Sequence, residues 1–387
     1  MGDDLRNRDG RGMPRTGPCV LHVVGARPNF VKMAPVIEAV GRAMPDTRQV
    51  VVHTEQHYDT EMSRVFFDEL GLARPTHSLD VGSGSHGAQT ARALERIERV
   101  LQDERPAALV VAGDVNSTLA AAIAAAKLDV PVAHVESGLR SFDRTMPEEV
   151  NRVLTDQLAR WCFTHSPEAE ENLLREGVAS SRIHFVGNTM IDTLVRLRDR
   201  FAASDVHARL GLERGNYLLV TLHRPSLVDG PLLDATMSAL AGVAQRLTVV
   251  FPVHPRTREQ LRGYRAEPQL HLIDPQPYVD FMALMSDARA VLTDSGGVQE
   301  ETTFLGIPCF TLRTTTERPV TVSAGTNRLL GLDPSAIAQI PNELAGFRTP
   351  VRPPEGWDGH AAERLARVLA GDVAANADVG VPVSAAG

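Results

Sequence analysis

The sequence predicts an α/β protein built on two open parallel sheets. Short runs of β-branched residues alternate with amphipathic segments rich in Ala, Leu and Arg, which is the pattern of βαβ units. These runs form two successive series, one in each half of the chain. A chain of 387 residues is also long enough for two domains of ordinary size.

The apolar runs define the expected strands. In the first half we expect strands at 20–24, 49–53, 108–112 and 132–136, and in the second half at 217–222, 247–253, 270–273, 290–293 and 308–311. Ligands of open parallel sheets bind beyond the carboxyl ends of the strands, where helix N-termini point their amides outward. The polar residues that follow each run are therefore the candidates for function, and two lobes would place them on both sides of a cleft.

The junction between the two halves is expected near Gly187. A strand-like run at 183–186 leads into Gly187 and Asn188, and a helical pattern follows. We therefore expect a first lobe at 18–187 and a second lobe at 188–370.

The two ends of the chain and the cysteines bear on its location. Residues 1–17 mix charges of both signs without the apolar core of a secretory signal, and 371–387 are rich in small residues without periodicity. We expect both terminal segments to be disordered.

The cysteines, Cys19, Cys162 and Cys309, are odd in number and lie in apolar sequence, which favours buried reduced thiols over disulfides or a metal site. A cytoplasmic protein is the expectation.

Composition excludes two classes of partner. No stretch approaches the roughly 18 uninterrupted apolar residues that a membrane span needs. The chain has 40 Lys and Arg against 48 Asp and Glu, a formal charge of −8, so it repels the phosphate backbone of nucleic acids.

The turn after the first expected strand has the features of an anion site. Gly25 permits a tight turn, Pro28 suits the first turn of a helix, and Arg27 and Lys32 place two cations near its positive end. The same residues also fit an ordinary turn with solvated charges. The segment lacks the GxGxxG pattern, so a nicotinamide cofactor is not supported.

Two further strands of the first half end in carboxylates. Asp114 follows one and could simply cap the next helix. Glu136 ends an apolar run, and a buried carboxylate costs several kcal/mol unless it is paired or functional. We favour function for Glu136 and, less strongly, for Asp114. Glu148 and Arg152 open a later helix, where such a pair usually stabilises a solvated face.

The second half supplies basic residues and a glycine-rich helix start. His223 with Arg224 and His254 with Arg256 follow two strands and would form a cationic rim. The helix start contains Ser295, Gly296 and Gly297, whose amides are open to a phosphate, and Glu301, which can accept bonds from ribose hydroxyls; Arg318 follows farther along.

Taken in order, these motifs resemble the non-hydrolysing UDP-N-acetylglucosamine 2-epimerases, relatives of the glycosyltransferase-B fold. The matching segments are GARPNFVKMAPV, HVESGLRSFDRTMPEEVNR, VTLHRP, FPVHPRTR, LTDSGGVQEE and TERPVTVSAGTNRLLG. The resemblance implies two Rossmann-like lobes facing a central cleft, a last helix that packs back on the first lobe, and a homodimer. It also implies no metal or cofactor, and interconversion of UDP-GlcNAc with UDP-ManNAc.

The resemblance also implies roles for individual residues. Asp114, Glu136 and Glu148 would be the acid/base carboxylates, with Arg152 beside them. The substrate would contact Arg27, Lys32, His223, His254, Ser295, Gly296, Gly297, Glu301 (ribose) and Arg318. A second UDP-GlcNAc, acting as an allosteric activator, would contact Gln56, Arg224 and His254.

The chemistry explains why these residue types are needed. The hydrogen on C-2 of the sugar is not next to a carbonyl, so UDP must begin to leave C-1 before a carboxylate can remove it. A cationic clamp would stabilise the departing diphosphate. Inversion then requires proton return on the opposite face, hence at least two acid/base groups. We expect crowding to raise the pKa of at least one of Asp114, Glu136 and Glu148.

Alternative functions remain at this point. The segments RSFDRTMPEE and QHYD also resemble relatives acting on UDP-2,3-diacetamido uronic acids, although those tend to carry a lysine where this chain has Glu300. A hydrolysing epimerase would release UDP and ManNAc. A glycosyltransferase of the same fold would not need the three carboxylates, and a silent sensor should have lost one of them or His223.

Overall fold

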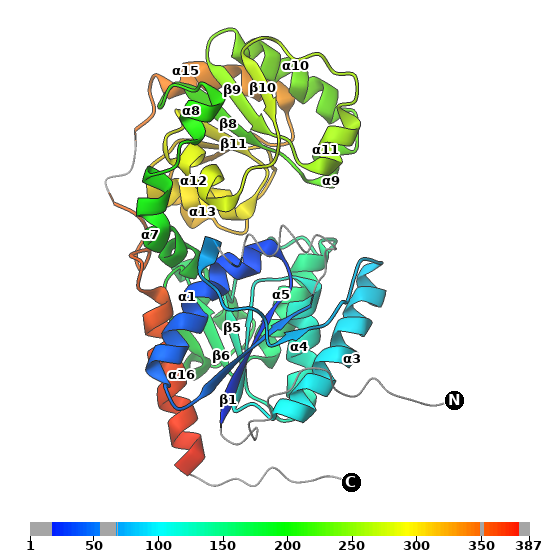
Figure 1. Ribbon diagram of the computed structural model, residues 1–387, viewed down its shortest axis with the longest axis vertical. Helices are drawn as coiled ribbons and strands as arrows, with labels where there is room; N and C mark the ends of the chain where they lie inside the picture. The colour runs from blue at the N-terminus through cyan, green and yellow to red at the C-terminus, as the bar shows by residue number, and fades with distance from the viewer. Residues whose placement is uncertain (1–17, 55–66, 68, 349–351, 379–387) are drawn as a thin grey trace.

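Two parallel sheets lie one beyond the other along the molecule (Figure 1). The computed structural model describes residues 18–54, 67, 69–348 and 352–378. In these residues the first sheet has the order β3-β2-β1-β4-β5-β6-β7 and the second has the order β10-β9-β8-β11-β12-β13. All recorded strand pairs are parallel.

The strands of the first sheet are β1 (Cys19–Val24), β2 (Arg48–His53), β3 (His77–Ser78), β4 (Ala108–Ala112), β5 (Val132–Val135), β6 (Trp161–Thr164) and β7 (Ile183–Phe185). Those of the second are β8 (Tyr217–Thr221), β9 (Thr248–Pro252), β10 (Leu270–Ile273), β11 (Ala290–Thr293), β12 (Cys309–Thr311) and β13 (Asn327–Leu329).

The α-helices are α1 (Arg27–Ala43), α3 (His86–Glu104), α4 (Asn116–Lys127), α5 (Pro147–Leu158), α6 (Pro167–Arg175), α7 (Thr189–Ala202), α8 (Val206–Leu210), α9 (Pro225–Val228), α10 (Leu232–Ala244), α11 (Pro255–Gln260), α12 (Tyr278–Ser286), α13 (Gly296–Leu305), α14 (Val320–Ser323), α15 (Ile340–Leu344) and α16 (Ala361–Asp378). Two 3₁₀ segments are η1 (Ser180–Arg182) and η2 (Pro334–Gln339).

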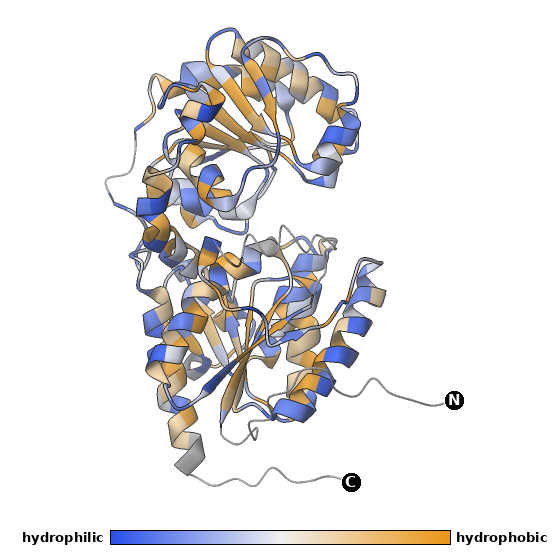
Figure 2. Cartoon of the chain, in the orientation of Figure 1, coloured by the Kyte–Doolittle hydropathy of each residue, from blue (hydrophilic) through white to orange (hydrophobic). Residues whose placement is uncertain are grey.

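Both faces of each sheet are buried, which explains the nearly continuous apolar runs. In β1, Val20 and Val24 join one apolar cluster while Leu21 and Val23 join another on the opposite face. The first of these clusters continues into residues of the second sheet such as Leu219. Figure 2 shows the same pattern, with apolar strands flanked by helices of mixed hydropathy.

The expected strands are all present, with ends within one residue of the predicted ones. Three further strands were not predicted: β3, β6 and β13. The first is only two residues long, and β13 reads Asn-Arg-Leu, which has no apolar alternation. The run Trp-Cys-Phe-Thr of β6 follows α5 after only two residues, so no turn signal separates them. The prediction of two parallel α/β sheets is confirmed.

Helix α16 returns from the second sheet to the first. It packs against α1 and α7, and its first amides, those of Ala361 and Ala362, donate to the carboxylate of Asp192 at 3.1 and 2.7 Å. Near its other end Asp372 accepts a bond of 2.6 Å from the indole of Trp161. The chain therefore crosses between the sheets twice, through α7 and again before α16 (Figure 1).

The predicted disordered tail at 371–387 is wrong for 371–378. These residues continue α16, because Ala favours helix and Val373 is buried against the first sheet's apolar cluster. The leader at 1–17 and residues 379–387 lie outside the described part of the chain. The three cysteines are buried and free, as predicted. Among the described helices, none is both long and apolar enough to cross a bilayer.

We expect Gly187→Ala to lower the melting temperature strongly. Gly187 has φ +89°, and a Cβ atom there would lie 1.9 Å from the carbonyl oxygen of Gly356. The left-handed conformation and the clash together should cost about 3 kcal/mol or more. Gly211→Ala is the matched control, because Gly211 has φ +64° and an added Cβ would meet no described atom within 4 Å. Equal losses in the two variants, measured by thermal unfolding, would contradict this reading of the junction.

Candidate functional site

A pocket of about 370 Å³ lies between the carboxyl ends of the two sheets. In each sheet the chain order reverses at one place, between β1 and β4 in the first and between β8 and β11 in the second. Crevices form at such reversals because the connections leave in opposite directions. The segments that follow β1, β4, β8 and β11 all contribute to the lining of the pocket.

Most of the predicted residues line this pocket: Lys32, Asp114, Glu148, Arg152, Arg224, Ser295, Gly296, Gly297, Glu301 and Arg318. Among the described residues, Glu136, His223 and His254 are not part of the lining. The side chain of Arg27 and the whole of Gln56 lie outside the description.

The start of α13 is built as an anion site. Ser295 occupies the N-cap position, and within the described chain its side chain makes no capping hydrogen bond. A Cβ at Gly296 would lie 2.5 Å from Nη1 of Arg318, so only glycine lets this guanidinium pack directly over the helix start. Free amides and a guanidinium therefore converge where a phosphate would bind.

Asp294 holds the imidazole of His223 in one orientation. Its Oδ2 accepts backbone bonds from His223 at 2.8 Å and Arg224 at 2.7 Å, and its Oδ1 lies 3.0 Å from Nδ1 of His223. Burial raises the pKa of Asp294, but these bonds outweigh burial and hold the pKa below its usual value. A carboxylate fixed on one ring nitrogen sets the orientation of the imidazole. The His223 side chain is 45% exposed, at the rim of the second sheet.

Glu301 is a buried carboxyl on the wall of the pocket. Its Oε1 accepts a bond of 3.3 Å from the hydroxyl of Tyr278. Burial and the neighbouring carboxylate of Glu300 raise the pKa of Glu301 to about 8. The free protein therefore holds Glu301 mainly protonated at neutral pH.

The Glu148–Arg152 pair does not form the solvated face that was expected in isolation. Arg152 is buried and pairs with Asp114 and, at 2.6 Å, with Glu149. Glu149 also accepts the amide of Ser141 at 2.9 Å. Asp114 thus faces Arg152 instead of capping α4, and Glu148 is left half-buried on the pocket wall.

Glu136 lies behind two cations of the pocket lining. Its backbone has φ +67°, a left-handed conformation that is rare outside glycine and common at functional sites. The carboxylate pairs with Lys32 and with Arg318. Burial raises the pKa of Glu136, but Lys32 and Arg318 outweigh it, so the pKa lies below the ordinary value. Glu136 is therefore not the carboxyl whose pKa the expected crowding raises.

Several residues of the site were missed by sequence analysis. Arg313 and Glu317 form a buried bidentate pair beside Arg318. His165 and Glu300 lie close to Glu136. Within the described part of the chain, these three side chains are near enough to one another to hold a metal ion. His165 directly follows β6, and recognising that strand would have singled it out.

The residues implied for an allosteric site are only partly described. The rings of His254 and His223 lie 6.4 Å apart, and Arg224 lines the pocket. Gln56 lies outside the described residues. An activator site formed by these three residues therefore stays a prediction.

We expect Glu301→Gln to gain stability relative to the parent chain as the pH rises. Because the folded pKa of Glu301, about 8, exceeds the ordinary value of 4.5, the folded state keeps a proton that the unfolded chain loses. The stability that this group contributes is therefore lost as the pH rises from about 5 to 8. The difference in melting temperature, variant minus parent, should be larger at about pH 9 than at about pH 5. A difference independent of pH would contradict the raised pKa.

Comparison with known proteins places the chain in a family. The family model for UDP-N-acetylglucosamine 2-epimerase matches residues 41–370. The UDP-N-acetylglucosamine 2-epimerase of Methanocaldococcus jannaschii is 39% identical over 90% of this chain and 97% of its own length. The UDP-2,3-diacetamido-2,3-dideoxy-D-glucuronate 2-epimerase of Pseudomonas aeruginosa is 38% identical over 91% of this chain and 99% of its own length.

The fold agrees with this assignment. A crystal structure of the Methanocaldococcus jannaschii enzyme in complex with UDP-GlcNAc and UDP superimposes with a TM-score of 0.82 at 38% identity, covering 91% of this chain and 99% of that one. The family model covers most of the chain, and a relative that is 39% identical matches it over 90% of its length; the chain therefore belongs to the UDP-N-acetylglucosamine 2-epimerase family.

Proposed function

We propose that this protein interconverts UDP-GlcNAc and UDP-ManNAc by eliminating UDP and adding it back. The observation that supports this most directly is the two-sided pocket. Carboxylates of Asp114 and Glu148 lie on the side of the first sheet, and the anion site of α13 and Arg318 lies on the side of the second. Leaving-group binding and proton transfer thus belong to one crevice.

In this proposal the nucleotide binds to the second sheet. The diphosphate takes the amides at Gly296 and Gly297 and the charges of Lys32 and Arg318, all of which line the pocket. Glu301 accepts hydrogen bonds from the ribose. His223, held by Asp294, and His254 contribute to the same cationic rim. Arg27, whose side chain lies outside the description, stays a predicted contact of the substrate.

The reaction begins with breakage of the bond between C-1 and UDP. The electron pair leaves with the diphosphate, and the positive charge that develops at C-1 acidifies the hydrogen on C-2. A carboxylate removes that proton as the C-1–C-2 double bond forms, giving 2-acetamidoglucal and UDP. A proton then returns to C-2 from the opposite face and UDP adds back to C-1.

Asp114, Glu136 and Glu148 are the proposed acid/base groups, and Arg152 is the proposed positioning residue for Asp114. Asp114 and Glu148 line the pocket from the side of the first sheet, and Glu136, which follows β5, lies behind Lys32 and Arg318 of the lining. A preorganised acid or base of this kind typically contributes about 10²- to 10⁴-fold to the rate.

The Pseudomonas aeruginosa relative makes a UDP-2,3-diacetamido uronic acid the second candidate substrate. Both substrates need the same diphosphate site and the same chemistry at C-2, and they differ at C-3 and C-6. A direct assay with each UDP-sugar separates them.

We also propose a cytoplasmic location. Cys19, Cys162 and Cys309 are free and buried, and free thiols are typical of a reducing compartment.

The test of the proposed function is incubation with UDP-GlcNAc in deuterated water, followed by NMR of the sugar. We expect deuterium at C-2 of both UDP-GlcNAc and UDP-ManNAc, with UDP retained, because the proton removed from C-2 exchanges before return. Free UDP with ManNAc would instead indicate hydrolysis, and exchange only with the diacetamido uronic acid would indicate the second substrate. No exchange with either sugar would contradict the proposal.

Variants sharpen this test. Asp114→Asn and Glu148→Gln should lower the exchange rate about 10²- to 10⁴-fold while UDP still binds. Glu343→Gln is the matched control, because Glu343 pairs with Arg328 away from the pocket and should leave exchange unchanged.

We expect the protein to be a homodimer whose interface includes the outer face of α5. Val150, Leu154 and Leu158 recur every four residues on this helix and are 37–45% exposed, and Phe142 nearby is 71% exposed. Such a stripe is self-complementary across a two-fold axis. Leu154→Glu should convert the dimer to monomers in light scattering, whereas Leu332→Glu, at an exposed leucine outside the stripe, should not. A monomeric parent chain would contradict the proposed dimer.

A further inference from the structure

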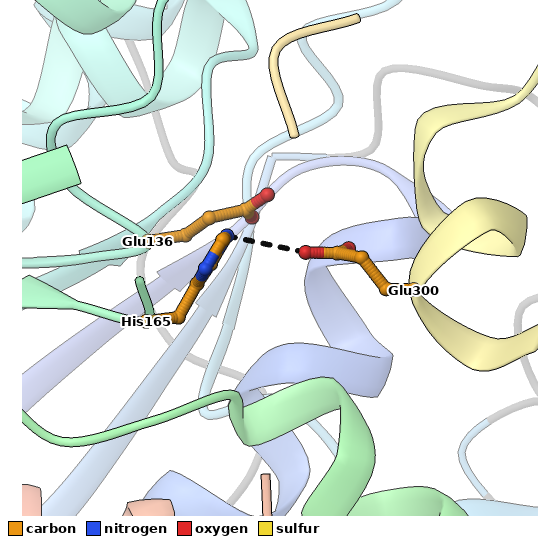
Figure 3. Close-up of side chains that lie close together, drawn as sticks. All are labelled: Glu136, His165 and Glu300. Atoms are coloured by element: carbon orange, nitrogen blue, oxygen red, sulfur yellow. Dashed lines mark ion pairs between the residues drawn. The ribbon is translucent and has the colours of Figure 1, made fainter. Parts of the chain in front are cut away.

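Three buried titratable side chains converge behind the pocket. One polar atom of each of Glu136, His165 and Glu300 lies within 4.8 Å of the other two (Figure 3). Glu136 is 9% exposed, His165 is 2% exposed and Glu300 is 1% exposed. Two of them come from the first sheet, after β5 and β6, and the third comes from α13 of the second. The cluster therefore joins the two sheets.

Glu300 and Glu136 share one arginine. Glu300 lies 3.0 Å from Nε of Arg318 through one oxygen, and its other oxygen lies 3.1 Å from Nε2 of His165 and accepts a 3.1 Å bond from Asn188. Nη2 of Arg318 pairs with Glu136. The guanidinium thus pairs with both carboxylates of the cluster at once.

The charged groups facing the cluster come from four segments. The cluster's own carboxylates are Glu136 after β5 and Glu300 of α13, and the cations that face them are Lys32 of α1 and Arg318 after β12. The ring centroids of His165 and Trp357 lie 5.9 Å apart in a T-shaped arrangement. Glu317 pairs with Arg313 and also lies 3.4 Å from Nη1 of Arg318, and Glu301 is bonded to Tyr278. The two cations therefore balance the two carboxylates of the cluster.

A bound diphosphate changes this balance. Lys32 and Arg318 line the pocket, and Arg318 packs over the start of α13, so the anion draws on the same two cations. Glu136 and Glu300 are then less neutralised, and two buried carboxylates this close do not both stay charged without compensation. A proton that enters the cluster can compensate this charge, and a ring nitrogen of His165 lies within 4.8 Å of both carboxylates.

We propose that His165 takes up a proton from solvent when the diphosphate binds, and that the resulting imidazolium keeps Glu136 ionised for proton transfer at C-2. The proton forms a bond to the unprotonated ring nitrogen, and it returns to solvent when the nucleotide leaves. His165 is thus a positioning residue that acts through Glu136, and Glu300 holds its ring. This inference rests on the proposed function, because it takes the diphosphate of a UDP-sugar as the anion.

The same three groups are also a donor set for a divalent cation. The carboxylates, however, already face Lys32 and Arg318, so a metal ion would lie against two positive charges. The geometry therefore favours a proton.

Histidine NMR tests the inference directly on the intact protein. With ring-labelled histidine at about pH 7.5, where free imidazole is mostly neutral, the His165 signal should move to its imidazolium position on saturation with UDP. His165→Gln identifies the signal. Uridine, which lacks the diphosphate, should not produce the change. An unmoved signal with UDP, or the same movement with uridine, would overturn the inference.

Kinetics supplies the second readout. His165→Gln should lower kcat about tenfold or more with KM within about threefold, and move the acid limb of the kcat profile to higher pH, because Glu136 must then bear the proton itself. His184→Gln, at a half-buried histidine on β7, is the control and should alter neither. An unchanged pH profile in His165→Gln would count against the inference.

The two proposals fail differently. A parent chain that gives the imidazolium signal with UDP but exchanges no hydrogen at C-2 would contradict the proposed function alone. An active parent chain without the signal would contradict only the role of His165.

Discussion

The arrangement of the site depends on the buried guanidinium of Arg318. It faces Glu136 from the first sheet and Glu300 and Glu317 from the second, the latter two at 3.0 and 3.4 Å. Removing a charge from water costs several kcal/mol unless partners replace the lost hydration. Arg318 therefore requires carboxylates of both sheets to be in place, and this requirement ties the two halves of the chain together at the floor of the pocket.

Two cations of this site, Arg152 and Arg318, each pair with more than one carboxylate. Arg152 holds Asp114 and Glu149 in the same way as Arg318 holds its carboxylates. Burial raises the pKa of Glu136 and of Glu149, but the cations and hydrogen bonds around each carboxylate hold its pKa below the ordinary value. Groups coupled in this manner do not contribute independently, so the effects of substitutions within one network are not additive.

The parallel strands fix where the site residues lie, and the segments that follow the strands carry the charged and catalytic side chains. Parallel strands deliver their following residues to one edge of each sheet, and the reversals of strand order open a crevice there. The left-handed backbone of Glu136 is strained for a side chain, and the ion pairs with Lys32 and Arg318 hold it. Gly296 has the converse role, since the absence of a side chain admits the guanidinium.

The sequence by itself determined the two sheets, most of their strands and most of the pocket residues, because apolar runs and the polar residues that end them are local features. It also identified the family through motifs that lie in order along the chain. Only the tertiary structure decided which charges meet. The partners of Arg318 lie 182, 18 and one residue away in sequence, and His165 reaches Glu300 across 135 positions. Apart from the contact with the adjacent Glu317, these pairings depend on how distant segments pack in three dimensions, and no local pattern encodes them.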